Sequence, residues 1–336
     1  MQVGPCADMK MFDTRWNGAH GIGRFAAELY ARIPGFMPVA LGGRPSSPID
    51  PIKLSGYLWR TSPRLFFSPG YNVPVGAPCP FIFCIHDLAH LQFPEYATAS
   101  RRTYYRLIVR PALSRAAAVL TVSEFSRAAL CDWGSIDGAR VINVGNGVSD
   151  VFSPDGPVFS STRRRYFLSV VNHRPHKNFT RTLEAFAAAR LAHDFDLLST
   201  SKPTPRMLAA VDALNLTNEV KFLAGLSDTE LAALYRGATG LVFPSLYEGF
   251  GLPIVEAMAC GTPVLTSSVT AMPEIAGGAA ILVDPTNVEA IADGLKRMAS
   301  DEGLRRTLSA RGLERAKAFS WQSTSERVRA ALACAI

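Results

Sequence analysis

The chain has 336 residues, of which 48% are hydrophobic and 19% are charged, and it carries a formal net charge of +7. This length favours two domains that each bury a core, and this composition excludes an intrinsically disordered chain. The six cysteines are scattered without a CxxC pair, which argues against structural zinc and favours a reducing compartment.

The N-terminal residues MQVGPCADMKMF contain no basic head followed by an apolar segment, so the sequence predicts no signal peptide. No apolar run approaches the roughly 20 residues of a membrane span. The first predicted strand is MKMF at 9–12, and the first predicted helix runs through RFAAELYARI at 24–33. Further strands of the first half are predicted at 81–87, 117–123 and 140–148.

Between the first strand and the first helix lies GAHGIGRF at 18–25, a glycine-rich loop. Its glycine order is G-x-x-G-x-G, which differs from the G-x-G-x-x-G order of dinucleotide-binding folds. A plain strand-to-helix turn explains this loop about as well as a phosphate-binding loop does. The loop alone therefore assigns no chemistry to Gly21 and Gly23.

His86 and Asp87 close the predicted strand FIFCIHD. Ligands of parallel sheets bind at the carboxyl ends of strands, which makes His86 a candidate site residue. A lone histidine at such a position is nevertheless more often structural. Ser123 opens the segment SEFS, which predicts an N-terminal cap for the helix that follows.

Five arginines and no acidic residue occur between residues 97 and 123. Arg102, Arg106 and Arg110 recur every four residues, as on one face of a helix, and apolar and aromatic side chains lie between them. The segment 101–115 can lie on anionic lipid head groups or form an ordinary solvated helix face, and these interpretations carry about equal weight. Nucleic-acid binding would need more basic residues and a recognisable module, and the sequence has neither.

A polar, proline-containing stretch at 150–165 separates two series of predicted elements, and we place the hinge between domains there. The second series begins with the strand YFLSVV and alternates strands and helices up to AILVD at 280–284. Such alternation predicts parallel sheets with helices on both faces. The expected fold class is α/β, with two doubly wound domains and a ligand site in a central cleft.

The most informative segment is FPSLYEGFGLPIVEAMACG at 243–261. The apolar run TGLVF at 239–243 leads into it and predicts a buried strand. The segment itself predicts a glycine loop and a helix that starts near Pro253 and stops at Gly261. Glu248 lies in the loop and Glu256 in the helix, so the two carboxylates flank a helix N-terminus that attracts anions. A diphosphate with a sugar on one side and a ribose on the other fits that arrangement.

This segment resembles the signature of the family-4 retaining glycosyltransferases, which have the GT-B fold and use nucleotide sugars. The family has Glu, seven residues and Glu, with GFG after the first acid and a sequence like EAMACG around the second. The resemblance covers nearly the whole chain and is most specific in its second half. It implies two Rossmann-like domains, an acceptor-side domain at 1–155 and a nucleotide-sugar-binding domain at 156–317, with a helix at 318–336 that returns to the first domain.

The resemblance also implies where the diphosphate is neutralised. Lys177 stands in PHKN, at a predicted strand-to-helix junction where the family commonly has Pro-Arg-Lys-Asn, and a lysine there can reach a diphosphate as a point charge. Many relatives have a second basic residue where this chain has Val171 and Asn172. Arg174 and His176 remain as alternatives for that second role.

From the resemblance we expect catalytic roles for His86, Lys177 and Glu248. The residues expected to bind the donor are Gly21, Gly23, Arg174, Lys177, Glu248, Gly249, Phe250, Gly251, Leu252 and Glu256. His90 and Glu95 are further candidates on the acceptor side. We expect no metal and no cofactor, because Lys177 and the helix start can stabilise the charge of a departing diphosphate.

The expected activity is retaining transfer of a hexose to a hydroxyl of a glycan or polyprenyl-linked acceptor, in polysaccharide or O-antigen synthesis. No side chain is evident as a well-placed nucleophile. The mechanism that the resemblance implies is therefore departure of the diphosphate and attack of the acceptor on the same face of the sugar. The HDL and EFS segments look most like bacterial polysaccharide mannosyltransferases, which favours GDP-mannose. UDP-glucose, UDP-galactose and dTDP-rhamnose stay open as donors.

Two rival functions stay open as well. A nicotinamide-dependent dehydrogenase also has Rossmann-like halves, but the glycine order and the missing ribose-binding acid count against it. A catalytically inactive relative that serves as a binding subunit is disfavoured by the presence of Lys177, Glu248 and Glu256. The expected location is the cytoplasm, with peripheral attachment to the inner face of the cytoplasmic membrane through 101–115 as an alternative.

Overall fold

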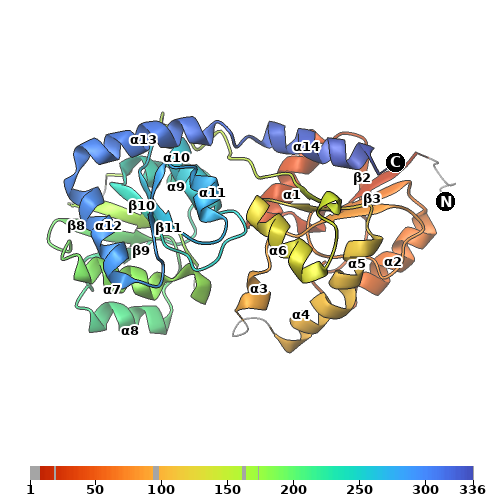
Figure 1. Cartoon of the computed structure of the whole chain (residues 1–336), viewed down its shortest axis with the longest axis horizontal. Helices are drawn as coiled ribbons and strands as arrows, with labels where there is room; N and C mark the ends of the chain where they lie inside the picture. The colour runs from red at the N-terminus through yellow and green to blue at the C-terminus, as the bar shows by residue number, and fades with distance from the viewer. Residues whose placement is uncertain (1–7, 19, 94–97, 161–163, 173, 336) are drawn as a thin grey trace. The chain divides into compact units, whose positions relative to one another are not determined.

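The computed structural model describes residues 8–18, 20–93, 98–160, 164–172 and 174–335 (Figure 1). The chain divides into two compact units: unit 1 takes in 1–147 and 320–336, and unit 2 takes in 148–319. Across the described ranges, no helix combines the length and the apolar character needed to cross a bilayer.

Unit 1 is built on a six-stranded parallel sheet with the strand order β2-β1-β3-β4-β5-β6. Its strands are β1 (Lys10–Phe12), β2 (Phe36–Pro38), β3 (Leu65–Ser68), β4 (Phe81–Cys84), β5 (Ala118–Thr121) and β6 (Val141–Asn143). Its α-helices are α1 (Gly21–Arg32), α2 (Asp50–Thr61), α3 (Ala89–Gln92), α4 (Ala99–Tyr104), α5 (Arg110–Arg115), α6 (Glu124–Gly134) and α14 (Trp321–Ala333). Central strands such as LFFS and FIFC are wholly buried, as expected where helices cover both faces of a parallel sheet.

Unit 2 is also built on a six-stranded parallel sheet, with the order β12-β11-β10-β7-β8-β9. Its strands are β7 (Arg165–Ser169), β8 (Phe195–Ser199), β9 (Val220–Phe222), β10 (Gly240–Phe243), β11 (Val264–Ser267) and β12 (Ala280–Val283). Its α-helices are α7 (Phe179–Ala188), α8 (Pro205–Ala213), α9 (Asp228–Gly237), α10 (Leu252–Ala259), α11 (Met272–Ala276), α12 (Val288–Ser300) and α13 (Glu302–Ala316). The helix α13 packs on α10, and α12 packs on α7 (Figure 1). The predicted α/β class with two doubly wound sheets is confirmed.

Each sheet has one switch point, where successive connections leave in opposite directions. In unit 1 the strand β1 has β2 on one side and β3 on the other, and in unit 2 the strand β7 has β8 on one side and β10 on the other. Ligands of such sheets bind in the crevice outside the carboxyl ends of the strands at the switch point. The loops after β1 and β3, and after β7 and β10, are therefore the places to look for a site.

The boundary between the units lies at Gly147 and not at residue 155. The Arg236 guanidinium, at the end of α9, donates hydrogen bonds to the carbonyls of Val151 and Ser153. The ring of Phe152 packs against a ring of the same helix. Residues 148–155 are thus held by unit 2 through ordinary packing and hydrogen bonds.

The last helix, α14, lies with unit 1 and packs beside α1 (Figure 1). Trp321 contacts Phe25 edge to face, with ring centroids 6.2 Å apart, and both side chains are buried. Gly147 approaches Trp321 so closely that a Cβ on Gly147 would lie 2.4 Å from the backbone nitrogen of Trp321. Unit 1 is therefore discontinuous in sequence and completes its core with residues from the far end of the chain.

The arginine-rich segment is helical but not uniformly α-helical. A π-helical turn at Tyr105–Val109 joins α4 to α5, and the Arg110 N–H bonds back to the Tyr105 carbonyl. Pro111 has no N–H to donate and its ring crowds the preceding turn, which explains why the helix widens here. The predicted cap of the next helix is confirmed, because Ser123 accepts a hydrogen bond from the Ser126 N–H.

Candidate active site

Lys177 and Glu248 form an ion pair at the switch point of unit 2. Lys177 ends the short helix η5 (Pro175–Lys177) after β7, and Glu248 lies in the loop after β10. The Lys177 Nζ is 2.7 Å from Oε1 of Glu248, and the side chains are 16% and 12% exposed. The ammonium also lies 5.2 Å from the ring centroid of Phe243. A partly buried ammonium and carboxylate are thus held together where a ligand is expected.

The glycine loop after β10 leads directly into a helix N-terminus. Gly251 has a φ of +100° and stands at the N-cap of α10, a backbone conformation that favours glycine. Pro253 is in the first turn, and Gly261, with a φ of +74°, follows the helix, so the predicted start and stop are confirmed. Because no side chain caps α10, its first N–H groups can take an anionic ligand.

Phe250 contributes its side chain to the core of unit 2. It is 5% exposed and packs edge to face on Phe319, with ring centroids 5.5 Å apart. Only its backbone is left for contact with a ligand, as for the buried glycines Gly249 and Gly251 beside it. Leu252 is the partly exposed first residue of α10.

Glu256 lies inside α10 and is 4% exposed. The hydroxyl of Tyr235, a wholly buried side chain of α9, donates a hydrogen bond to its Oε2 at 3.0 Å. Tyr235 gives no signal in the sequence, because it lies 21 residues upstream and only the fold brings it to the carboxylate. The tyrosine holds one carboxylate oxygen in place.

Thr270 is a second site residue that the sequence does not reveal. Its hydroxyl accepts a hydrogen bond from the Glu248 N–H at 3.3 Å. Its φ is +58°, a left-handed conformation that is strained for a β-branched side chain. The strained residue therefore supports the backbone of Glu248, the loop acid of the site.

Asn178 ties together three loops at the carboxyl edge of the unit 2 sheet. Its Nδ2 donates to the carbonyl of Pro244, after β10, at 2.9 Å and to that of Pro285, after β12, at 2.7 Å. The residue is buried and has a φ of +60°. Asn178 is thus a scaffold that fixes Lys177, its neighbour in sequence, relative to the loop of Glu248.

Two buried hydroxyl groups lie at the ends of the strands that flank the switch point. Ser169 is the last residue of β7, and Ser245 follows β10. Both side chains are completely buried, and neither hydroxyl oxygen hydrogen-bonds to any residue that the structure describes. Burying a polar group costs free energy unless the group forms a hydrogen bond, so these two hydroxyls favour a polar ligand or water at this edge of the sheet.

The two candidates for the second basic residue lie in different surroundings. Arg174 is exposed, and its N–H donates to Oδ1 of Asn172. His176 is 4% exposed, and its carbonyl accepts from the Leu246 N–H at 2.7 Å. Arg174 is therefore better placed to extend toward a ligand than His176.

In unit 1 the glycine loop is a tightly packed helix start. A Cβ on Gly23 would lie 2.3 Å from the Gly18 carbonyl oxygen, so the close approach of the backbone requires glycine there. His20 caps α1, with Nδ1 accepting from the Gly23 N–H at 3.0 Å. Gly21 is the exposed first residue of α1. Packing alone accounts for Gly23, and donor binding by Gly21 and Gly23 stays a prediction.

His86 is fixed from three sides after β4. Its Nε2 lies 3.0 Å from the Pro69 carbonyl, its ring meets Phe25 edge to face at 4.8 Å, and its carbonyl accepts from the Ser126 hydroxyl. Burial lowers the pKa of His86, so the ring is neutral near pH 7. A neutral ring with Nε2–H donated to Pro69 leaves Nδ1 as an acceptor.

His90 is buried, and its ring lies 3.8 Å from the ring centroid of Tyr105. Its Nε2 hydrogen-bonds to no residue among those described. Burial lowers the pKa of His90 to about 4, although the negative charge of Asp87 acts to raise it. This environment indicates a core side chain. Glu95, the other acceptor-side candidate, lies outside the described residues.

His90 should make stability depend on pH. The folded state holds the ring neutral, whereas the unfolded chain protonates it below about pH 6.5, so stability falls as pH drops from about 6.5 toward 4. The loss should reach roughly 3 kcal/mol. His90→Phe should remove that part of the pH dependence in urea titrations, and His193→Gln, at an exposed histidine, should not. An unaltered profile in His90→Phe would contradict the assignment.

No group of three or more potential metal ligands is found among the described residues. One Asp-x-Asp spacing occurs in the sequence, at Asp194 and Asp196, and it belongs to no such group. Asp196 is buried near the amino end of β8 and pairs with Lys221 at 2.5 Å.

Burial raises the pKa of the Cys260 thiol to about 12, so this cysteine of the signature is no thiolate nucleophile.

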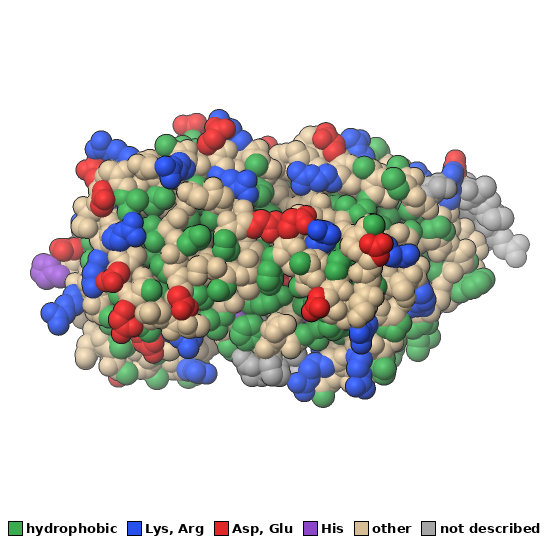
Figure 2. All heavy atoms as spheres, viewed as in Figure 1, with side chains coloured by type: hydrophobic (Ala, Val, Ile, Leu, Met, Phe, Trp, Pro, Cys, Tyr) green, Lys and Arg blue, Asp and Glu red, His purple; other side chains and the backbone are tan. Residues whose placement is uncertain are grey.

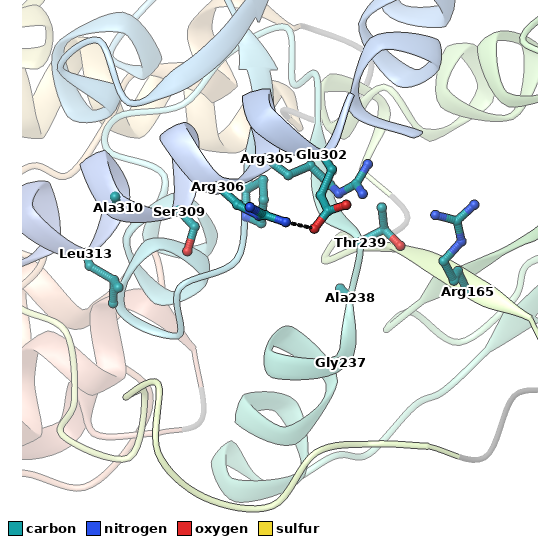
Figure 3. Close-up of a pocket in the computed structure, with 11 residues that line it drawn as sticks. Arg165, Gly237, Ala238, Thr239, Glu302, Arg305, Arg306, Ser309, Ala310 and Leu313 are labelled. Carbon is teal, nitrogen blue, oxygen red and sulfur yellow. Dashed lines mark hydrogen bonds and ion pairs between the residues drawn. The ribbon is translucent and has the colours of Figure 1, made fainter. Parts of the chain in front are cut away.

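A cavity of about 600 Å³ opens at the opposite edge of the unit 2 sheet (Figure 3). One face of α13 and the segments before β10 and β11 line it. Among its arginines, Arg305 donates to the carbonyls of Met298 and Ala299, and Arg306 pairs with Glu302. The cavity lies at the amino ends of the strands, apart from the candidate site around Lys177.

Both halves of this chain are similar to known protein families. Residues 19–152 match the family model described as Glycosyltransferase Family 4, and residues 157–315 match the model described as Glycosyl transferases group 1. O-antigen chain mannosyltransferase B of Escherichia coli is 31% identical over 259 residues, which are 73% of this chain and 68% of that protein. Serotype-specific mannosyltransferase WbdA of Escherichia coli is 29% identical over 276 residues, or 76% of this chain, which spans about a third (33%) of that protein.

The solved structure of Anabaena Alr3699/HepE, in complex with UDP and glucose, has a TM-score of 0.77 to this chain. The match covers 97% of this chain and 99% of that one at 16% identity, so it shows a shared fold. Two parallel sheets with loops gathered at their switch points define a protein of the GT-B type. Together with the family models and the relative that is 31% identical, this shows that the chain belongs to the family-4 glycosyltransferases.

Proposed function

We propose that this glycosyltransferase moves a hexose, with retention, from a nucleoside diphosphate sugar to a hydroxyl of a glycan or lipid-linked acceptor in polysaccharide or O-antigen synthesis. The observation that carries the proposal is the Lys177–Glu248 pair beside the uncapped N-terminus of α10. GDP-mannose is the first choice of donor, because relatives that cover most of this chain are named mannosyltransferases. UDP-glucose, UDP-galactose and dTDP-rhamnose are the alternatives.

In the proposed reaction the bond between the sugar carbon and the diphosphate oxygen breaks, and the diphosphate leaves with the electron pair. Lys177 and the first N–H groups of α10 stabilise the charge that develops on the diphosphate. The acceptor hydroxyl attacks the same face of the sugar and transfers its proton to the departing oxygen. Glu248 and Nδ1 of His86 accept hydrogen bonds from sugar hydroxyls, and Arg174 supplies a second positive charge. None of these steps uses a metal or a cofactor.

A thermal-shift screen against nucleotide sugars tests the donor class. A ligand at 100 times its dissociation constant stabilises a protein by roughly 2.7 kcal/mol. GDP-mannose should raise the Tm more than the UDP and dTDP sugars, and GDP release should follow when a suitable acceptor is present. Binding of NADH in place of nucleotide sugars would support the dehydrogenase alternative, and donor binding without hydrolysis or transfer would support an inactive binding subunit.

Glu256→Gln should chiefly weaken nucleotide binding. We expect the carboxylate to hold ribose hydroxyls equally in the ground state and the transition state, so its loss raises KM more than it lowers kcat. Glutamine keeps an oxygen for the Tyr235 hydroxyl, whereas alanine would strand that buried donor. Calorimetric titration with the free nucleoside diphosphate measures the effect. An unchanged affinity would rule out the ribose assignment.

We also propose that unit 1 attaches to anionic membrane through 101–115. Arg102, Arg106 and Arg110 are exposed, and Leu107 between them is 57% exposed. Figure 2 shows basic side chains gathered at the edge of unit 1 around α4. Basic groups combined with exposed apolar side chains suit a surface of anionic lipid head groups.

The helix α2 offers a second surface of the same character. Ile52 and Trp59 are 67% and 62% exposed and lie seven residues apart, two helical turns, on one face. Lys53 and Arg60 are exposed beside them. Tryptophan is favoured at the boundary between water and lipid, so Trp59 can report on insertion by its fluorescence.

Changing Arg102, Arg106 and Arg110 together to glutamine should weaken liposome binding by about 3 kcal/mol, since each basic group near an anionic surface contributes about 1 kcal/mol. Native binding should fade as salt rises. The control with the same charge change replaces three exposed arginines of unit 2, Arg297, Arg306 and Arg311. Activity on a soluble acceptor should survive. A wild-type protein that ignores anionic liposomes at low salt would leave 101–115 as a solvated helix.

A further inference from the structure

A buried ion cluster occupies the switch point of unit 1. Arg15, just after β1, lies between two carboxylates: its Nη2 is 2.7 Å from Oδ2 of Asp13, and its Nη1 is 2.6 Å from Oδ1 of Asp50. The side chains of Arg15, Asp13 and Asp50 are 8%, 0% and 2% exposed. Charges are costly to bury, and two carboxylates share one guanidinium here. Such a cluster at the carboxyl ends of β1 and β3 calls for a role beyond simple packing.

Asn72 joins this cluster to the turn after β3. Its Nδ2 donates to Oδ2 of Asp13 at 2.7 Å and to Oδ2 of Asp50 at 3.3 Å. Its Oδ1 accepts from Nε1 of Trp16 and from the hydroxyl of Ser68. Asn72 and Ser68 are completely buried, so these bonds form away from solvent. One amide therefore connects the two carboxylates with both loops of the switch point.

The same turn holds His86. The Pro69 carbonyl lies 3.0 Å from Nε2 of His86. On one side of Pro69 the Ser68 hydroxyl oxygen lies 3.0 Å from the Gly70 carbonyl oxygen and accepts a hydrogen bond from the Gly70 N–H at 3.4 Å. On the other side the Gly70 backbone lies so close to the Trp16 indole that a Cβ would come within 2.4 Å of the ring. The Pro69 carbonyl therefore has little freedom unless the cluster loosens.

We propose that Asp13, Arg15, Asp50 and Asn72 are positioning residues for His86. They hold the Pro69 carbonyl against the ring, keep the ring proton on Nε2, and leave Nδ1 as the acceptor for a sugar hydroxyl. The buried ions thereby serve the reaction from a distance, through the turn 68–72. This inference rests on the proposed role of His86 in contact with the donor sugar. Asp87 and His20 are the other titratable groups that act on the ring.

The direct test is nuclear magnetic resonance of His86 in Asn72→Ala and in the milder Ser68→Ala, which removes only a hydroxyl. In the wild type the Nε2–H should exchange slowly with solvent, and the nitrogen shifts should show one neutral tautomer. Protection should fall at least about tenfold in Asn72→Ala and by a smaller factor in Ser68→Ala. Leu113→Ala, a core change outside the cluster, should lower thermal stability yet keep the protected signal.

Kinetics separate positioning from general damage. Asn72→Ala should lower kcat by about tenfold to a hundredfold, with a smaller change in the KM of the donor, because a misplaced contact acts mainly in the transition state. In a His86→Ala background the same change should cost no further activity, since coupled residues are not additive.

Three results bear on the inference separately. An Asn72→Ala loss that is equally large with and without His86 would overturn it. A protected Nε2–H signal that persists in both Asn72→Ala and Ser68→Ala would overturn it too, whatever the activity. Wild-type activity in His86→Ala would remove His86 from the proposed reaction, while the resonance experiment would still decide whether the cluster holds the ring.

Discussion

Lys177→Ala is expected to lower kcat/KM by about 30- to 900-fold, which corresponds to roughly 2–4 kcal/mol of lost transition-state stabilisation. The ammonium is the positive charge held at the switch point of unit 2, and charge grows on the diphosphate as it leaves. Its removal also strands Glu248, whose carboxylate is 12% exposed and 2.7 Å from the ammonium. Steady-state kinetics with saturating acceptor measure the effect.

Lys177→Arg should restore only part of the activity, because a planar fork replaces a compact charge. Lys177→Ala combined with Glu248→Gln shows how much of the loss comes from the stranded carboxylate. Lys296→Ala, which removes an exposed lysine paired with Asp293, is the matched control and should change little. Activity of Lys177→Ala within twofold of the wild type would show that another group neutralises the diphosphate.

Arg15→Gln is expected to destabilise unit 1 by roughly 3–5 kcal/mol, the usual cost of removing one partner from a buried ion pair. It leaves Asp13 and Asp50 buried without their cation. Chemical denaturation followed by far-UV circular dichroism measures the loss. The comparison is Arg64→Gln, which breaks an exposed pair with Asp8 and should cost no more than about 1 kcal/mol.

Neutral partners should rescue this variant. With Asp13→Asn and Asp50→Asn added to Arg15→Gln, no charge is left in the cluster, and much of the stability should return. A triple variant no more stable than Arg15→Gln would mean that the arginine stabilises unit 1 by packing and hydrogen bonds, with no penalty from unpaired carboxylates.

The order of strands and helices could be predicted because their apolar runs are local. FIFC, GLVF and AILV become strands where predicted, and the helix of the signature starts beside Pro253 and stops before Gly261, as predicted. The edge strand β2 was not predicted, because its FMP sequence is short and contains Pro38. The central strand β3 was not predicted either, because LFFS is only four residues long and lies beside a loop with no periodic pattern.

The site was predictable only as far as its motif reaches along the chain. Lys177 and Glu248 are recognisable by their neighbours in sequence, and the fold brings them together. The contacts of Asn178 with Pro285 and of Arg15 with Asp50 join residues that are far apart in sequence. Their roles follow from tertiary contacts, which no local pattern encodes.

The discontinuity of unit 1 has a consequence for how the protein is made. Trp321 covers Phe25 and Gly147, so the hydrophobic core of unit 1 stays open on the ribosome until residues 320–336 have been synthesised. Unit 2, by contrast, is continuous in sequence. It can therefore close its core before unit 1 does, although most of unit 1 is translated first. A nascent chain that stalls before α14 would expose the Phe25 surface to chaperones and proteases.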